Sequence, residues 1–297
     1  MEALLAIING TTAVPVALAK LIDTIGCQIG LYREAGNIRR VGQANANVVV
    51  AAAKAKVETD IIKADGKVTL ADIKSRAEER VRNHEAQRQV NIEAIAGKAA
   101  SELPEQVSDA PVEPDWTAQF FESCKDVSDD QMRTVWAKLL AGEVSKPGSF
   151  SLRTLACVKV LSKADADLFT RFCSLLWHRE NGFIPFTPKS ADLPVDGTAL
   201  VNFDEFLRLA SLNLISFMPG ISGYELRFTA EPVTSLMYYG KRHNLSHASV
   251  RALDIGVALL TKMGEELVVI SGGVPNESYR QATVDRFRSS GWTVIDE

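Results

Sequence analysis

Apolar residues recur at three- and four-residue steps between Ser128 and Glu143, and this spacing predicts an amphipathic helix. Ser128 and Gln131 form a capping-box pattern at its start, and Pro147-Gly148 ends it. A second apolar run follows from Leu152 to Leu161, so we expect a helical hairpin at the centre of the chain. The positions expected to face the core from the first helix are Met132, Val135, Trp136, Leu139 and Leu140.

Residues 1 to 32 are unusually apolar, and Glu2, Lys20 and Asp23 are their charged members. The uncharged run 3–19 is slightly shorter than the roughly twenty residues that a membrane-spanning helix needs, and it lacks the basic start and cleavage site of a signal peptide. Three interpretations stay open: a helix at an oligomer interface, a segment that contacts a membrane, and an extension of a core. The residues expected to make oligomer or membrane contact are Leu4, Leu5, Ile7, Ile8, Val14, Val16, Leu18, Leu21 and Ile22.

Residues 31 to 99 predict a long helical hairpin. Small and apolar positions from Ile38 to Ala55 step by three and four, as in the seam of a coiled coil. Asp65-Gly66 interrupts the pattern, and Thr69 with Asp72 forms a capping box for the second helix. The basic residues of this region favour a solvated face over one that contacts phosphate or lipid. Asn91 and its neighbouring amide and acid indicate hydrogen bonds between helices rather than a site.

Three prolines among acidic residues mark residues 101–115 as a linker and as the expected domain boundary. They are Pro104, Pro111 and Pro114. The sequence therefore predicts an apolar N-terminus plus helical hairpin at 1–100, the linker at 101–115, a central helical domain at 116–181, and a winged-helix-like α/β domain at 182–297. We expect the aromatic residues of the central domain to fill one core rather than to stack on bases.

The pattern after Gly182 predicts the α/β part of an otherwise mainly α-helical chain. Asn202 can cap a helix, and the strand candidate Tyr224–Phe228 follows a turn, which together are typical of a winged helix. A strand and then a helix are expected between Leu253 and Leu267. A strand-helix-strand unit ends the chain, and its strands should be parallel if they share a sheet. Its expected parts are Leu267–Ile270, Asn276–Ser290 and Trp292–Ile295.

The composition is that of a folded soluble protein, with 46% hydrophobic and 24% charged residues. The net charge of -4 argues against nonspecific coating of nucleic acid, because such proteins usually carry a basic excess. The four cysteines are widely spaced and include no Cys-x-x-Cys pair, which favours buried, reduced thiols. They are Cys27, Cys124, Cys157 and Cys173. We therefore expect a cytoplasmic protein, with peripheral contact at the inner membrane as the alternative location.

The sequence offers weak signals for chemistry. His243 and His247 are four residues apart, as on one face of a helical zinc site, but no ligand pair accompanies them nearby. Ser271-Gly272-Gly273 superficially resembles a phosphate loop, yet it lacks the Lys and Ser/Thr of a Walker motif, and an ordinary tight turn is the favoured interpretation. We therefore assign no catalytic residue, metal or cofactor, and the balance leans against an enzyme.

The central block resembles a known family. Trp116-Thr-Ala-Gln-Phe-Phe121, Ser128-Asp-Asp-Gln-Met132, Trp136-Ala-Lys-Leu-Leu-Ala-Gly-Glu143 and Pro147-Gly-Ser-Phe-Ser-Leu-Arg-Thr154 are similar to the bacterial family catalogued as domain of unknown function 2806. The resemblance runs from about residue 36 to residue 267. More distantly, the Trp-x-x-Leu-Leu helix and its Pro-Gly break are similar to abortive-infection and phage-defence proteins. The resemblance implies a bacterial, intracellular protein with a defensive role, and it supplies no catalytic residues.

We expect a non-enzymatic assembly protein, a defence sensor or effector that forms a homo-oligomer or touches membrane through its N-terminal helices. Its C-terminal half would then bind a protein partner or a phage component. The first alternative is a winged-helix nucleic-acid binder, and the second is an unrecognised hydrolase. The basic residues expected to serve nucleic-acid binding are Arg208, Arg227, Lys241, Arg242 and Arg251.

Overall fold

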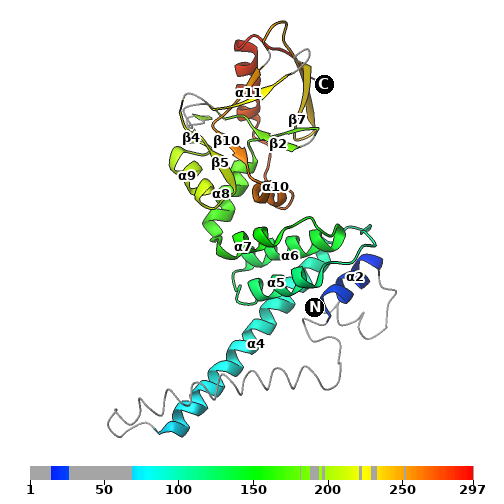
Figure 1. Cartoon of the computed structure of the whole chain (residues 1–297), viewed down its shortest axis with the longest axis vertical. Coiled ribbons are helices and arrows are strands. Elements are labelled where there is room, and N and C mark those ends of the chain that lie inside the picture. Colours follow the sequence, from blue (N-terminus) through cyan, green and yellow to red (C-terminus); the bar gives the residue numbers. More distant parts are fainter. Residues whose placement is uncertain are drawn as a thin grey trace. The chain divides into compact units, whose positions relative to one another are not determined.

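The computed structural model describes residues 15–26, 69–180, 182–187, 194–195, 198–220, 223–228, 233–250 and 252–296 (Figure 1). The chain forms two compact units, Met1–Ser145 and Lys146–Glu297. The described part is mainly helical, and the second unit also contains sheets of antiparallel strands. This agrees with the expected fold class, a mainly helical chain with a C-terminal part that mixes helices and strands.

The first unit is built from helices. Aromatic rings form its core: Phe120 and Trp136 meet edge to face with ring centroids 5.4 Å apart, and Trp116 stacks on Phe120 at 5.2 Å. Phe120, Trp136, Leu139 and Leu140 are fully buried, as the helical spacing predicts. The helices are α2 (Val16–Ile25), α4 (Leu70–Glu102), α5 (Pro114–Cys124) and α6 (Asp130–Ser145).

The cap of helix α6 lies one residue later than the sequence predicts. The carboxylate of Asp129 accepts a hydrogen bond from the Met132 amide at 2.9 Å, so Asp129 occupies the capping position that we had expected of Ser128. The next predicted helix also forms, as α7 (Leu152–Val160) with Ser151 as its cap. Because α6 belongs to the first unit and α7 to the second, their pairing as a hairpin stays a prediction.

Helix α4 starts at the predicted capping box of Thr69 and Asp72. Its N-terminal half extends beyond α5 and α6 (Figure 1), and its C-terminal half packs against α6 through the buried Ile95, Ala96 and Ala99. Asn91 confirms the expected hydrogen bonds between helices. Its side chain donates to the Lys125 carbonyl at 2.8 Å and accepts from the Arg133 guanidinium at 2.6 Å.

The proline-rich segment lies inside the first unit. Helices α4 and α6, on either side of it, pack against each other, and Val112 is buried within the segment. The Ser108 amide donates to the Ser145 carbonyl at 2.8 Å, which fixes the segment to the end of α6. The division between the two compact units falls after Ser145. Proline and acidic residues predict extended backbone, but extended backbone can also lie on a core.

A five-stranded antiparallel sheet, in the order β11-β8-β7-β1-β2, organises the second unit. Burial alternates along β7 and β8, so Leu236, Tyr238, His243 and Leu245 point to the same buried side. Helix α11 (Glu277–Ser289) covers that side, where Phe287 contacts Trp177. The strands are β1 (Leu176–Arg179), β2 (Gly182–Pro185), β7 (Val233–Tyr238), β8 (Lys241–Ser246) and β11 (Thr293–Asp296).

Short strand pairs and helices complete this unit. The strand β5 (Ile215–Phe217) pairs with β10 (Ala258–Leu260), and β6 (Tyr224–Arg227) pairs with β9 (Ala252–Gly256). The expected helix at Asn202 and strand at Tyr224 are present, but β5 and β6 each pair with a later strand, so the winged helix stays a prediction. The remaining elements are β3 (Pro194–Val195), β4 (Thr198–Ala199), α8 (Lys163–Cys173), α9 (Phe203–Ser211) and α10 (Lys262–Val268).

The prediction of a terminal strand-helix-strand unit was wrong in its first strand. Leu267 and Val268 belong to α10, and the Ile270 amide donates to the Leu267 carbonyl in a turn. The Thr261 hydroxyl caps the N-terminus of α10, and the helix continues through the first residues of the apolar run Leu267–Ile270. So short a run cannot be told from a helix end by spacing alone. The final strand β11 does form, and it pairs antiparallel with β8.

Among the described residues, no helix combines the length and the apolar character needed to cross a bilayer.

Candidate functional site

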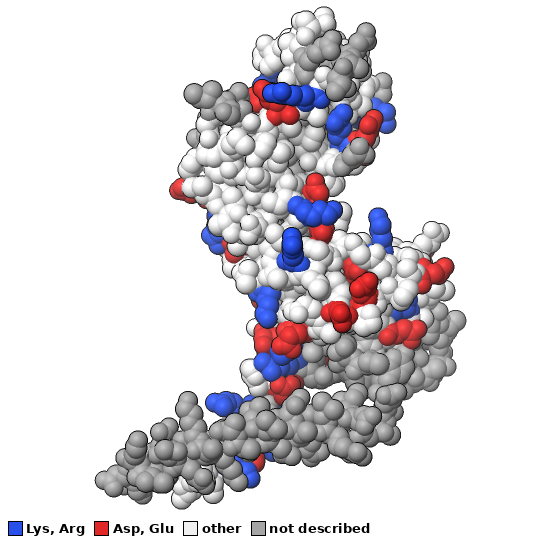
Figure 2. Space-filling model, in the orientation of Figure 1, with Lys and Arg blue, Asp and Glu red and all other residues white. Residues whose placement is uncertain are grey.

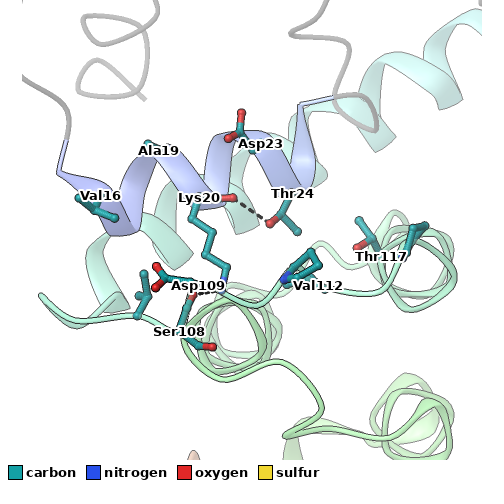
Figure 3. Close-up of a pocket in the computed structure, with 12 residues that line it drawn as sticks. Val16, Ala19, Lys20, Asp23, Thr24, Ser108, Asp109, Val112 and Thr117 are labelled. Carbon is teal, nitrogen blue, oxygen red and sulfur yellow. Dashed lines mark hydrogen bonds between the residues drawn. The ribbon is translucent and has the colours of Figure 1, made fainter.

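A hollow in the first unit lies between α2 and residues 107–117, and we call it the α2 groove (Figure 3). Its volume is about 590 Å³. Helix α2 contributes Val16, Ala19, Lys20, Asp23 and Thr24. The opposite wall includes Ser108, Asp109, Pro111, Val112 and Thr117.

Helix α2 has two faces. Ala17, Leu21 and Ile25 recur at four-residue steps and are buried, and α2 contacts α6 and α4 of its own chain. Val16, Ala19, Lys20 and Asp23 recur on the other face and line the groove. This division is the ordinary result of helical periodicity in a segment with few polar residues. One face of α2 therefore packs on the core of its own unit, and the other face lines the groove.

The opposite wall is held at both ends. Pro111 and Pro114 fix their backbone φ, and Pro114 begins α5 at a position where its missing N–H costs nothing. Val112 is buried between them, and Ser108 is tied to the end of α6. The groove therefore has a helix on one side and a constrained extended segment on the other.

Lys20 joins the two walls. Its amine donates a hydrogen bond to the Ser108 carbonyl, and Figure 3 shows its side chain crossing from α2 to the segment below. The Thr24 hydroxyl donates to the Lys20 carbonyl at 2.8 Å. Asp23 lies one turn further along the same face, and Asp109 lies on the opposite wall. The groove thus combines one cation and two acids with the small or apolar surface of Val16 and Ala19.

This arrangement suits docking better than chemistry. A helix laid along an elongated hollow of small and apolar residues is a common mode of protein recognition. The described residues that line the groove include no histidine or cysteine. Within the described part of the chain, no group of three or more His, Cys, Asp or Glu side chains could hold a metal ion.

The structure separates the contact residues expected on the N-terminus. Val16 is 72% exposed and lines the groove, whereas Leu21 is buried in the core of its own unit. Leu18 and Ile22 are half-buried. The expected contacts Leu4, Leu5, Ile7, Ile8 and Val14 lie outside the described residues, as does the coiled-coil seam at 38–55.

The expected nucleic-acid residues lie on different elements, and three of them are close to acids. Arg208 of α9 contacts Asp165 at 2.5 Å, Arg227 of β6 lies 3.5 Å from Glu225, and Lys241 of β8 lies 3.1 Å from Glu277. Arg242 is exposed on β8, and Arg251 lies outside the described residues. On the face that Figure 2 displays, described basic and acidic side chains are interspersed.

The two histidines do not share a helical face, because His243 lies in the strand β8 and His247 directly follows that strand. His243 is buried, and its Nδ1 lies 2.6 Å from the Asp296 carboxylate. The Nδ1 of His247 accepts hydrogen bonds from the Ser249 and Val250 amides. Ser271-Gly272-Gly273 connects α10 to α11 as a turn, with the Gly273 amide donating to the Ser271 hydroxyl at 3.4 Å.

The described cysteines are buried free thiols, as expected. They are Cys124, Cys157 and Cys173. Burial raises the pKa of the Cys173 thiol to about 12, and it also raises the pKa of Cys157. Such thiols are protonated near neutral pH and are poor nucleophiles.

Sequence reasoning missed most of the groove. The sequence marks Lys20 and Asp23 only as charged members of an apolar segment, and it predicts a linker at 101–115, which covers most of the opposite wall. The available signal was the spacing of Val16, Ala19, Lys20 and Asp23, which places them on one helical face.

Comparison with known proteins gives one match. The model of the family described as "Protein of unknown function (DUF2806)" matches residues 75–283, which is more than half of the chain. No curated protein and no solved structure matches significantly. The matched region includes the proline-rich wall of the groove, and α2 lies outside it.

Proposed function

The chain belongs to the DUF2806 family, and because the family description names no activity, we propose a function from the groove: a non-enzymatic assembly protein that self-associates through α2. The observation that carries the proposal is the outer face of α2. It presents the exposed Val16 together with Lys20 and Asp23, which are three residues apart on the same face. A face with both charges can be complementary to a second copy of itself.

A two-fold axis makes this complementarity explicit. In an antiparallel pair of α2 helices whose axis passes between Lys20 and Asp23, each Lys20 lies opposite Asp23 of the other copy. The same register places Ala19 opposite Thr24, so small side chains meet where the helices are closest. Lys20 can retain its bond to the Ser108 carbonyl, because an ammonium group has three donors.

The expected association is weak. Helix α2 has 10 residues, which is short for an interface, and interfaces that bury less than about 1,200 Å² are usually transient. We therefore expect a dissociation constant on the order of micromolar or weaker. Such an equilibrium would respond to local concentration, which suits a sensor or a scaffold.

Sedimentation velocity over a range of concentrations tests the proposal. The wild-type chain should shift from monomer to dimer as concentration rises, and Ala19→Arg should remain monomeric because it fills the groove. Ala156→Arg, at an exposed position of α7, is the matched control and should dimerise like wild type. Wild type that stays monomeric up to several hundred micromolar, or an equal loss in both variants, would exclude self-association through α2.

Charge reversal gives a second test of the register. Lys20→Glu and Asp23→Lys should each weaken the dimer, because each places like charges opposite one another. The double variant should recover part of the association. If the double variant loses as much association free energy as the two single variants together, the antiparallel pairing is contradicted, even if a dimer exists.

The role in defence rests on the sequence resemblance and remains part of this proposal. Membrane contact through the N-terminus is the competing use of α2, and flotation with anionic vesicles would detect it. The nucleic-acid alternative has less support, because acids lie beside Arg208, Arg227 and Lys241.

A further inference from the structure

A second hollow, of about 370 Å³, lies in the Lys146–Glu297 unit, and we call it the Tyr239 pocket. Its size falls within the range of about 300–1,000 Å³ that is common for small-molecule sites. It is formed where β1, β2, the β7–β8 turn and the end of α10 meet. The side chains that matter for binding are Leu176, His178, Phe183, Met237, Tyr239 and Val269.

Tyr239 adopts a backbone conformation that is unusual for its residue type. The turn between β7 and β8 consists of Tyr239 and Gly240, with φ of 44° and 88°. Two successive positive φ values are typical of a hairpin turn that prefers Asn, Asp or Gly at its first position. Residues held in such strained backbone conformations cluster at active sites and ligand clamps.

Contacts hold the Tyr239 side chain as one wall. Its hydroxyl donates to the Cys173 carbonyl at 3.0 Å, and its ring meets that of Tyr238 edge to face with centroids 5.0 Å apart. The residue is nevertheless 42% exposed. Tyr239 is therefore fixed in place while part of its aromatic surface stays accessible.

The turn Ser271-Gly272-Gly273 forms a neighbouring wall of the pocket and lies close to Tyr239. A Cβ added to Gly273 would lie 2.8 Å from the Tyr239 hydroxyl and 2.9 Å from Cys173 Cβ, so this approach requires glycine. The turn is also anchored, since the Ser271 carbonyl accepts from the Thr170 hydroxyl and the Ser271 hydroxyl donates to the Val268 carbonyl, both at 2.8 Å. The pocket is thus preformed.

The lining fits a neutral ligand. Among the described residues that line the pocket, none is Lys, Arg, Asp or Glu. A charged ligand would lose its hydration here without gaining an opposite charge, whereas a neutral ring would lose little. Phe183 and Tyr239 offer aromatic surface, and the Met237 thioether contacts rings favourably.

We propose that the Tyr239 pocket binds a small, neutral aromatic molecule between Phe183, Met237 and Tyr239. Val269, which is 70% exposed, forms its rim, and His178 offers a hydrogen bond to a polar substituent of the ligand. The site is independent of α2 and of self-association, since all its described residues belong to the second unit.

Two exposed valines allow a matched test. The full chain is titrated with N-phenyl-1-naphthylamine, a neutral aromatic probe whose fluorescence rises in apolar surroundings. Val269→Asp places a charge at the rim and should weaken binding at least tenfold. Val274→Asp makes the same change at a residue that is 65% exposed and is not among the lining residues, so it should bind like wild type.

Saturable binding that Val269→Asp loses and Val274→Asp keeps would support the proposal. Circular dichroism must show that both variants melt like wild type. If Val269→Asp does not fold, Met237→Ala replaces it, because this change removes the flexible thioether without adding a charge. Absence of saturable binding by wild type would overturn the proposal. So would an equal effect of the two aspartates, or unchanged binding by Met237→Ala where it replaces Val269→Asp.

Discussion

Glu266 of α10 bonds to Thr154 and thereby supports the Ser151 cap at the N-terminus of α7. Its carboxylate accepts from the Thr154 hydroxyl at 2.6 Å and from the Ser151 amide at 2.7 Å. Thr154 is fully buried, so the bond lies away from water. A negative charge at the N-terminus of a helix is also favoured by the helix dipole. Residues 112 positions apart thereby join two helices within the second unit.

Replacing Glu266 should therefore destabilise this unit. We expect Glu266→Gln to lower the free energy of unfolding by about 1–2 kcal/mol, since it removes a charge-assisted bond and the interaction with the dipole. Urea unfolding followed by circular dichroism measures the change. Glu265→Gln is the control, because Glu265 is exposed and lies 4.0 Å from the exposed Lys262. Equal losses in both variants would contradict the capping role.

The buried His243 provides a second prediction. Its Nδ1 lies 2.6 Å from Asp296, and its ring packs on Trp177 with centroids 5.0 Å apart. Because Asp296 lies on β11, this contact helps attach the last strand to β8. We expect Asp296→Asn to destabilise the protein by about 1 kcal/mol and to speed hydrogen exchange of the β8 and β11 amides.

The nearby Asp285 supplies the control for this change. It lies on α11, at 3.6 Å from Arg288, in an exposed ion pair. Asp285→Asn should change stability by less than about 0.5 kcal/mol and leave exchange in β11 unaltered. Slow exchange that persists in Asp296→Asn would show that the strand pairing alone holds β11.

Local signals in the sequence predicted the helix starts well. Thr69 with Asp72, and Asn202, form caps at the expected positions. A capping box is readable because its partners are three residues apart and both bonds form within one turn. The apolar stripe of α6 was equally readable, since helical spacing alone decides which residues face the core.

Contacts between distant residues were not readable in the same way. The groove depends on Lys20 and Ser108, which are 88 positions apart, and no local pattern marks such a pair. Strand partners posed the same problem, because alternation predicts β6 but not its pairing with β9. The strand predicted at Leu267–Ile270 was wrong for a different reason. The helix α10, which begins after its cap at Thr261, includes Leu267 and Val268, although the composition of this run favours a strand.

Acid should weaken the second unit through Glu277. Hydrogen bonds from Arg280 and then Lys241 lower the pKa of this carboxyl from 4.5 to about 2. A carboxyl whose pKa is lower in the folded chain stabilises the fold above its ordinary pKa and loses that contribution as pH falls through the folded value. Melting temperatures measured from pH 7 to pH 3 should fall less steeply for Glu277→Gln than for wild type. Parallel profiles would exclude this source of acid sensitivity.

The last prediction concerns Asn91, which connects α4 to the start of α6. Asn91→Ala would leave the Lys125 carbonyl and the Arg133 guanidinium without the side-chain partner that Asn91 supplies. A buried donor or acceptor that loses its hydrogen-bond partner pays the full cost of its desolvation. We therefore expect the free energy of unfolding to fall by about 1–3 kcal/mol. Gln89→Ala, whose amide bonds Glu93 within the same helix at 2.9 Å, should cost less than about 0.5 kcal/mol.

Exchange of the α4 amides distinguishes a local effect from a global one. If Asn91 attaches α4 to the first unit, amides from Asn91 to Ala99 should exchange faster in Asn91→Ala, while those of α11 in the second unit keep their wild-type rates. A uniform rise across both units would instead mean that the substitution lowers global stability, and that the α4 contact is not a separate cooperative element.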